Sequence, residues 1–468
     1  MVRWPCGTLS GMSNAGVTDE SSPTGQPPLK RVLGSKLLLF FVVGDIVGTG
    51  IYALTGQVAG RVGGALWLPF LLAFTVAFMT AFSYLELVGK YPRAAGAALY
   101  THKAFNIRML TFLVAFAVMC SGITSASSAA VAFGDTYIAE FITAPMPLMA
   151  IAFIALLALI NFRGVRESVT TNVVLTCIEI GGLLIIIGVG VWAVLNGSGD
   201  ASRLAEFNTQ DQTMLVAITS ATSLAFFSMV GFEDSVNMAE ETKDPARVFP
   251  KAMLWGMVIA ATIYILVSVT SSLLVPAEGL EAAESGALLK VIDIGAPGMP
   301  REIFSAIGLF AVVNSALINM LMASRLVYGM ANERIIPKVF GTVHPARRSP
   351  WVAILFTSAI AVVLVSVVDI DVLGGTTALL LLVVFAVVNV AVLVLRRDPV
   401  PHNHFRAPTV VPVLAAVFCL YLASPLSGRP ARDYVVAAIL LAVGLVLWAV
   451  NHVAMRALHQ KQSADASR

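Results

Sequence analysis

Long apolar runs restrict the folds open to this chain more than any other feature of its sequence. A helix needs about 20 mostly apolar residues to cross the hydrocarbon core of a bilayer. Soluble domains carry charge on about a quarter of their residues, whereas here 12% are charged and 58% are hydrophobic. We therefore predict an all-α membrane protein with 12 transmembrane helices. The expected spans are residues 36–58, 64–88, 109–137, 145–162, 169–195, 213–239, 251–275, 303–331, 351–368, 373–395, 408–426 and 433–455.

Lysine and arginine are distributed unevenly over the segments between these spans. Basic residues near span ends stay preferentially on the cytoplasmic side. With both termini in the cytoplasm, six of the 30 basic residues fall outside: Arg61, Arg203, Lys290, Arg301, Arg429 and Arg432. We therefore expect a multi-pass protein of the cytoplasmic (inner) membrane with both termini inside. The net charge of +3 reflects that face and does not indicate a nucleic-acid partner.

The two ends of the chain are expected to be unstructured. Residues 1–33 are rich in Gly, Ser, Pro and Thr, which is typical of a disordered cytoplasmic tail and not of a cleaved signal peptide. Residues 457–468 are predicted to form a second cytoplasmic tail. The four cysteines are expected to be free thiols, because each falls inside a span or on the cytoplasmic side: Cys6, Cys120, Cys177 and Cys419.

The first span is interrupted by polar and glycine residues. Residues 44–51 read GDIVGTGI, an acid and three glycines within an apolar run. A broken helix exposes backbone groups that hydrocarbon cannot satisfy, so the break is tolerated only where it lines a cavity or binds something. The segment is therefore the first candidate for a substrate site.

The sixth span repeats this interruption at residues 226–234, FFSMVGFED, with Gly231 lying 183 positions after Gly48. Glycine-interrupted spans at matching positions indicate two five-helix repeats with a transport site between them. Glycines that only allow close helix packing are the alternative. Acids beside both breaks favour the transport site.

Carboxyl groups at membrane depth are costly, at about 2.5 to 3.5 kcal/mol each on insertion scales. Asp45, Glu179, Glu233 and Asp234 are the deepest. Glu86 and Arg325 lie nearer cytoplasmic ends, where pairing or snorkelling explains them. The deep acids are therefore candidates for function.

Two spans carry a polar face at helical spacing. The third has Ser121, Thr124, Ser125 and Ser128, and the fifth has Ser168, Asn172, Thr176 and Glu179. Hydroxyl groups commonly join helices in membranes, so contact between helices and a role in the site both stay open for the third span.

Motifs of enzymes are absent from the sequence. There is no HExxH or GxSxG, and the six histidines fall in cytoplasmic segments or at their edges. The Gly-x-Gly at residues 48–50 follows no soluble strand and opens no βαβ unit, so it does not predict nucleotide binding. We expect no enzyme activity, no cofactor and no metal.

Three stretches resemble the amino acid–polyamine–organocation (APC) superfamily of secondary transporters. They are GDIVGTGIYALTG at 44–56, AFFSMVGFEDSVNMAEETKDPARVFPKAM at 225–253 and ASRLVYGMANERIIPKVFGTVHPARRSP at 323–350; ELVGKYPRAAGAALY at 86–100 is a weaker match. The resemblance implies a LeuT-type fold of inverted repeats with helices 1 and 6 unwound. Its parts would be residues 34–196 (helices 1–5), 212–397 (helices 6–10) and 408–456 (peripheral helices 11 and 12).

The resemblance also implies how an amino acid would bind. N–H groups at the first break would face its carboxylate, at the positive end of a half-helix. Carbonyls at the second break would accept its ammonium group, and Phe227 resembles the aromatic gate over the substrate. The candidate substrate-binding residues are Ile46, Gly48, Thr49, Gly50, Ile51, Ser125, Phe227, Ser228, Val230, Gly231, Phe232 and Asp234.

Glu179 departs from the family pattern. In proton-coupled bacterial relatives this position often resembles a lysine, whereas here it is an acid able to take up and release a proton. Asp45 is the alternative proton-coupling residue, and the sequence does not choose between them.

We therefore predict an amino acid importer that works by alternating access, with the proton as co-substrate and the lipid bilayer as its surroundings. An uncoupled exchanger of amino acids or amines is the alternative, and a polyamine permease is less favoured. Glu233 and Asp234 would attract a cationic side chain or cap a half-helix, so neutral and cationic substrates both stay open. The oligomeric state is not predicted.

Overall fold

A computed structural model of the chain describes residues 34–92, 96–142, 144–163, 168–208, 212–332, 336–345, 347 and 349–466. These residues form an all-α protein without strands. Its α-helices are α1 (Ser35–Ile46), α2 (Thr49–Val62), α3 (Trp67–Lys90), α4 (Gly96–Phe105), α5 (Arg108–Ala132), α6 (Met146–Arg163), α7 (Ser168–Leu195), α8 (Met214–Ala225), α9 (Pro245–Leu274), α10 (Ala277–Ala282), α11 (Ala287–Gly295), α12 (Arg301–Asn332), α13 (Trp351–Val367), α14 (Ile370–Leu395), α15 (Val410–Ala423) and α16 (Ala431–Ala466).

Ten helical segments of the described chain are long and apolar enough to cross a membrane, and α13 and α15 are shorter apolar helices. Each of the 12 expected spans overlaps one of these segments. Two spans are composite, since α1 and α2 together form Ser35–Val62 and α8 opens Met214–Ala239. The protein is therefore a multi-pass membrane protein.

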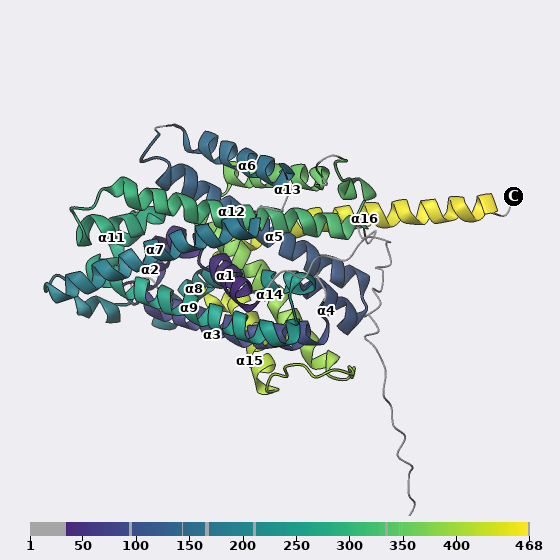
Figure 1. Ribbon diagram of the computed structural model, residues 1–468, viewed down its shortest axis with the longest axis horizontal. Coiled ribbons are helices and arrows are strands. Elements are labelled where there is room, and N and C mark those ends of the chain that lie inside the picture. Colours follow the sequence, from purple (N-terminus) through teal and green to yellow (C-terminus); the bar gives the residue numbers. More distant parts are fainter. Residues whose placement is uncertain are drawn as a thin grey trace, which may run out of the picture.

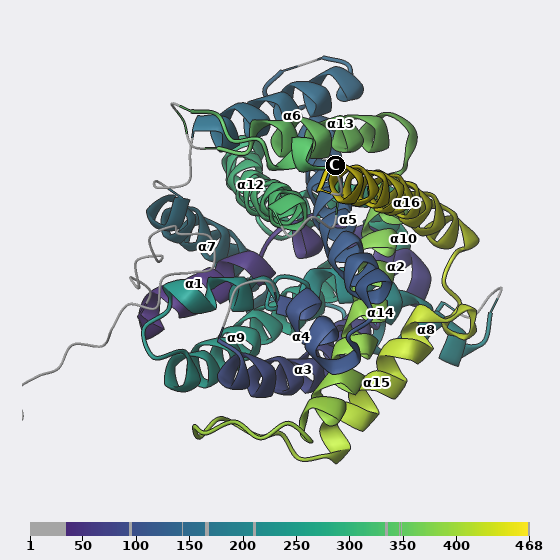
Figure 2. The ribbon, with the colours of Figure 1, turned by 90° about the vertical axis from the view of Figure 1, so that its right-hand side faces the viewer.

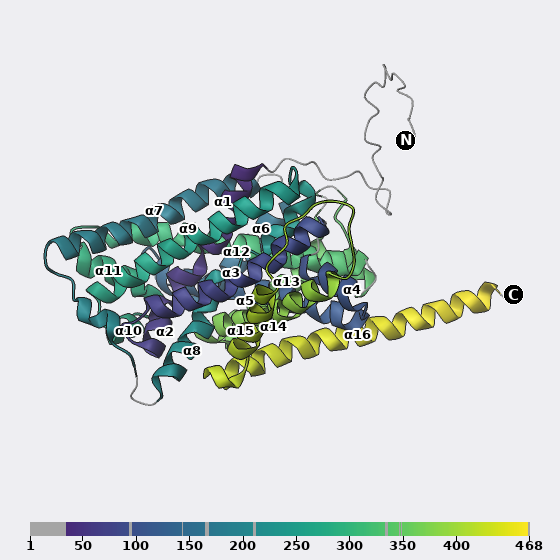
Figure 3. The same ribbon diagram turned by 90° about the horizontal axis from the view of Figure 1, so that it is seen from below.

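The helices form one elongated bundle (Figure 1). Seen end-on, α5 and α14 lie inside the ring, whereas α6 and α13 pack together at its edge (Figure 2). The short helices α4 and α11 lie at opposite ends of the bundle (Figure 3). We call the end that carries α4 the α4 end.

The C-terminal segment differs from the prediction. We expected residues 457–468 to be an unstructured tail, but α16 continues as a helix to Ala466 and extends beyond the bundle (Figures 1 and 3). The segment contains three Ala and two Gln, which have high helix propensity, and it continues a helix that α16 has already formed. The predicted tail at residues 1–33 lies outside the described residues.

A buried ion pair holds α3 against α14. The Arg396 guanidinium donates to both carboxylate oxygens of Glu86, with N–O distances of 2.8 and 2.7 Å. Glu86 also accepts the backbone N–H of Ala407 at 2.9 Å. The expectation that pairing explains Glu86 is confirmed, and its partner is 310 residues away in the chain.

Cys120, Cys177 and Cys419 are free thiols. This confirms the expectation for the three cysteines within the described residues; Cys6 lies outside them.

Candidate functional site

Both glycine-containing interruptions are breaks in the helices. α1 ends at Ile46 and α2 begins at Thr49. α8 ends at Ala225 and is followed by a single 3-10 turn, η3 (Phe226–Met229), and then by an extended Val230. The chain resumes as a 3-10 helix, η4 (Asp234–Glu241).

The two breaks lie against each other, and glycine permits the contact. A Cβ atom on Gly50 would lie 2.5 Å from the Ser228 Cα, closer than real atoms approach. Gly231 has φ +125°, and a Cβ there would lie 2.7 Å from the Asp45 carbonyl oxygen. Residues far apart in sequence are therefore brought together at the centre of the bundle.

A pocket opens where the breaks meet, and we call it the central pocket. It is lined by Asp45, Ile46, Thr49, Gly50, Ser125, Phe227, Val230, Gly231, Ser315 and Asn319. Eight of these were singled out from the sequence as binding or coupling residues. Ser315 and Asn319 on α12 were not, although two polar side chains in an apolar span are themselves a signal of function.

The backbone around the first break offers donors to this pocket. The Gly48 N–H donates to the Ile46 carbonyl at 2.9 Å. Thr49 and Gly50 stand in the first turn of α2, where N–H groups have no partner within the helix. They also lie at the positive end of the helix dipole, which favours an anion.

The second break offers acceptors. The Phe227 carbonyl accepts the Val230 N–H at 3.2 Å, which closes the 3-10 turn. The chain then becomes extended at Val230, so α8 ends in a short run of carbonyl groups. The ring of Phe227 is buried and borders the pocket.

The remaining candidate residues lie around the pocket. Gly48 lies against Ser315, and a Cβ on it would be 3.0 Å from the Ser315 side chain. The Ser228 hydroxyl is buried beside Gly50 and has no hydrogen-bond partner in the described part of the chain. Ile51 is fully buried in the core, and Phe232 packs against the ring of Tyr84 at 5.8 Å.

The polar face of the third span divides between two roles. Ser125 lines the central pocket. The Thr124 hydroxyl lies 2.5 Å from that of Thr377 on α14, and the Ser128 hydroxyl donates to the Ile370 carbonyl at 3.4 Å. Thr124 and Ser128 therefore join helices.

Glu179 on α7 is fully buried beside two asparagines. Its Oε2 accepts the Asn314 Nδ2 at 3.4 Å, and the Asn172 Nδ2 donates to the Asn314 Oδ1 at 3.2 Å. Its Oε1 has no hydrogen-bond partner within the described residues. Tyr52 donates to the Glu179 carbonyl at 2.8 Å, which ties α2 to α7 next to the break.

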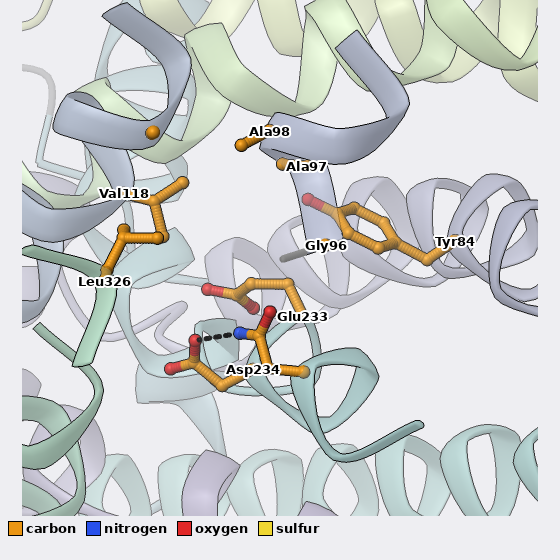
Figure 4. A pocket seen from close by; sticks show the side chains of 10 residues that line it. Tyr84, Gly96, Ala97, Ala98, Val118, Glu233, Asp234 and Leu326 are labelled. Carbon is orange, nitrogen blue, oxygen red and sulfur yellow. Dashed lines mark hydrogen bonds between the residues drawn. The ribbon is translucent and has the colours of Figure 1, made fainter. Parts of the chain in front are cut away.

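Glu233 and Asp234 face away from the central pocket into a second pocket, shown in Figure 4. The Glu233 Oε2 accepts the Gly231 N–H at 2.9 Å, so this carboxyl caps the break itself. The second pocket is lined by Tyr84, Gly96, Ala97, Ala98, Ala115, Val118, Glu233, Asp234, Asn237 and Leu326. Among the described residues, no cluster of side chains is suited to hold a metal ion.

Two broken helices that meet at a polar pocket inside a multi-pass bundle are the arrangement of a secondary transporter. The sequence model of the family described as amino acid permease matches residues 33–458, so the chain belongs to the amino acid permease family. This confirms the resemblance to the APC superfamily, and it makes the protein a transporter and not an enzyme.

Characterised relatives differ in what they carry. The chain is 26% identical to a branched-chain amino acid permease of Bacillus subtilis, over 86% of this chain and 89% of that protein. It is 27% identical to the methylthioribose transporter of the same species, over 92% and 95% of the two chains. It is also 27% identical to the human cationic amino acid transporter 4, over 80% of this chain and 61% of the relative.

Proposed function

We propose that the protein imports amino acids across the cytoplasmic membrane by alternating access, coupled to protons. The observation that carries this proposal is the meeting of the two helix breaks at the central pocket. Paired breaks at matching positions of two repeats are typical of a transport site. We infer inverted repeats at residues 34–196 and 212–397, with the helices of residues 408–456 at the periphery.

The pocket suits the two charged groups common to all amino acids. The N–H groups of Thr49 and Gly50 would bind the carboxylate at the start of α2. The carbonyls of Ser228 and Val230, at the end of α8, would accept the ammonium group. A polyamine has no anion for the first set of groups, so we propose an amino acid.

Glu179 is the proposed coupling residue. The Glu179 carboxyl group is fully buried and has a single long hydrogen bond to Asn314, so protonation would disturb few contacts. A bound proton is also the simplest way to neutralise a carboxylate at this depth. Both termini would be cytoplasmic, in keeping with the distribution of basic residues.

The test is reconstitution of Glu179→Gln in liposomes. We expect the variant to keep exchange of internal for external amino acid within about threefold of the wild type and to lose accumulation driven by an inward proton gradient. Glu302→Gln, an exposed carboxyl at the start of α12, is the matched control and is expected to accumulate substrate normally. Intact accumulation by Glu179→Gln would overturn its role.

An uncoupled exchanger is the second candidate, and the contact of Glu179 with Asn314 favours it, because that contact gives the acid a structural role. In that case the wild type would take up labelled substrate only into preloaded vesicles, with no response to a proton gradient.

A further inference from the structure

Three buried carboxyl groups surround Gly231. Asp45 is 5% exposed and lines the central pocket, where its Oδ2 has no hydrogen-bond partner among the residues that the structure describes. Glu233 and Asp234, 5% and 9% exposed, line the second pocket (Figure 4). The three acids therefore connect two separate spaces.

Gly231 contacts both Asp45, which lines the central pocket, and Glu233, which lines the second pocket. Its N–H donates to Glu233, whereas its Cα faces Asp45, and a Cβ would lie 3.0 Å from the Asp45 Cγ. Its φ of +125° is a conformation that other residues rarely adopt. A side chain here would displace Asp45, so glycine allows Asp45 to lie against the residue whose N–H binds Glu233.

The second pocket offers these acids polar but uncharged neighbours. Figure 4 shows the Tyr84 ring reaching into the pocket, and its buried hydroxyl has no partner within the described residues. The Tyr100 ring lies behind it at 6.2 Å. The Asn237 Nδ2 donates to the Asp234 Oδ1 at 3.5 Å.

The surrounding helices also carry charged groups. Glu179 on α7 lies on the Asp45 side. Arg325, next to Leu326 on α12, also has an interaction partner. Within the described part of the chain, none of the eight salt bridges involves Asp45, Glu233 or Asp234.

Three neighbouring carboxylates repel one another, and each is costly at this depth. Sharing protons removes both costs, and groups coupled in this way titrate as a set. The Asp45 Oδ2, which has no hydrogen-bond partner among the described residues, can accept or donate a proton through a water molecule.

We propose that Asp45, Glu233 and Asp234 form a proton path from the central pocket to the α4 end of the protein. The O–H bond at Asp45 breaks and one forms at Glu233. That bond then breaks as one forms at Asp234, and the Asp234 O–H bond breaks when the proton passes to water in the second pocket, so each carboxyl group returns to its starting state. The inference rests on the proposed proton coupling and adds the route by which the proton leaves.

The test uses the full-length protein in liposomes that contain a pH-sensitive dye. Glu233→Gln with Asp234→Asn removes both exit carboxyl groups, and the glutamine carbonyl still accepts the Gly231 N–H. We expect substrate-driven acidification of the lumen to fall at least tenfold, with amino acid exchange at equal pH within about threefold of the wild type. Glu278→Gln with Glu281→Gln, two exposed acids on α10, is the control and should behave as the wild type.

The outcomes separate the two proposals. Acidification unchanged in the double variant overturns the path and leaves proton coupling standing. A wild type that exchanges amino acids without moving protons overturns both. If the double variant loses exchange as well, the single variant Asp234→Asn decides: reduced acidification with normal exchange supports the path, and normal acidification overturns it.

Discussion

Asp433→Asn tests how much of the stability of the fold rests on a buried ion pair at the start of α16. The side chains of Arg429 and Asp433 are both fully buried, with 3.0 Å between Nη1 and Oδ2. Arg429 also donates to the carbonyls of Gly375 at 2.6 Å and Ser223 at 3.2 Å. This one guanidinium therefore joins α8, α14 and the loop before α16.

Removing one partner of a buried pair leaves the other charge uncompensated, which costs about 3 to 5 kcal/mol. Globular proteins gain about 2.1 cal/mol/K of unfolding entropy per residue. Over 468 residues the loss corresponds to a fall of about 3 to 5 °C in the midpoint of thermal unfolding. Asparagine keeps the shape of the side chain, so the change isolates the charge.

The assay is thermal unfolding of the purified protein in detergent, followed by intrinsic fluorescence. Asp369→Asn is the control, because Asp369 pairs with Arg432 at 3.3 Å while both side chains are about three-quarters exposed. An exposed pair contributes about 0 to 1 kcal/mol, so its midpoint should fall by less than about 1 °C. Equal shifts for the two variants would refute the argument that burial makes the pair important.

Two further variants test the packing of the site and of the bundle. Gly50→Ala places a Cβ against the Ser228 backbone and is expected to lower the rate of amino acid exchange at least tenfold. Gly188→Ala, with open space around it, is the control and should transport normally. Equal exchange rates for the two variants would contradict the close contact at Gly50. Glu86→Gln leaves the Arg396 guanidinium without its counter-charge, so the unfolding midpoint should fall by about 3 °C or more, and an unchanged midpoint would show that the pair is dispensable.

Much of the architecture was predictable because membrane insertion acts on local sequence. A run of about 20 apolar residues indicates a membrane-spanning helix wherever it occurs. A glycine-rich interruption inside such a run indicates a helix break, whose backbone groups need polar surroundings. GDIVGTGI and FFSMVGFED were therefore recognisable as helix breaks and as a candidate site before any contact was known. Ser315 and Asn319 were not predicted, because both are neutral and neutral polar side chains also join helices in membranes.

The direction in which a side chain points could not be predicted in this way. Asp45 and Asp234 belong to the same pair of breaks, yet one lines the central pocket and the other lines the second pocket. Arg429 was counted as an external basic residue, but its side chain is fully buried. These differences depend on how each helix is rotated against its neighbours.

The sequence by itself determined that this is a helical membrane protein of the amino acid permease family, where its helices break and which acids lie deep. Only the tertiary structure decided that Gly231 faces Asp45 and that Glu179 contacts Asn314. The physical reason is that hydrophobicity and backbone needs are properties of a local segment. Contacts between residues more than 100 positions apart depend on how the whole bundle packs. At a close contact, such as that of Gly231 with Asp45, the size of a single residue decides whether the two segments can meet.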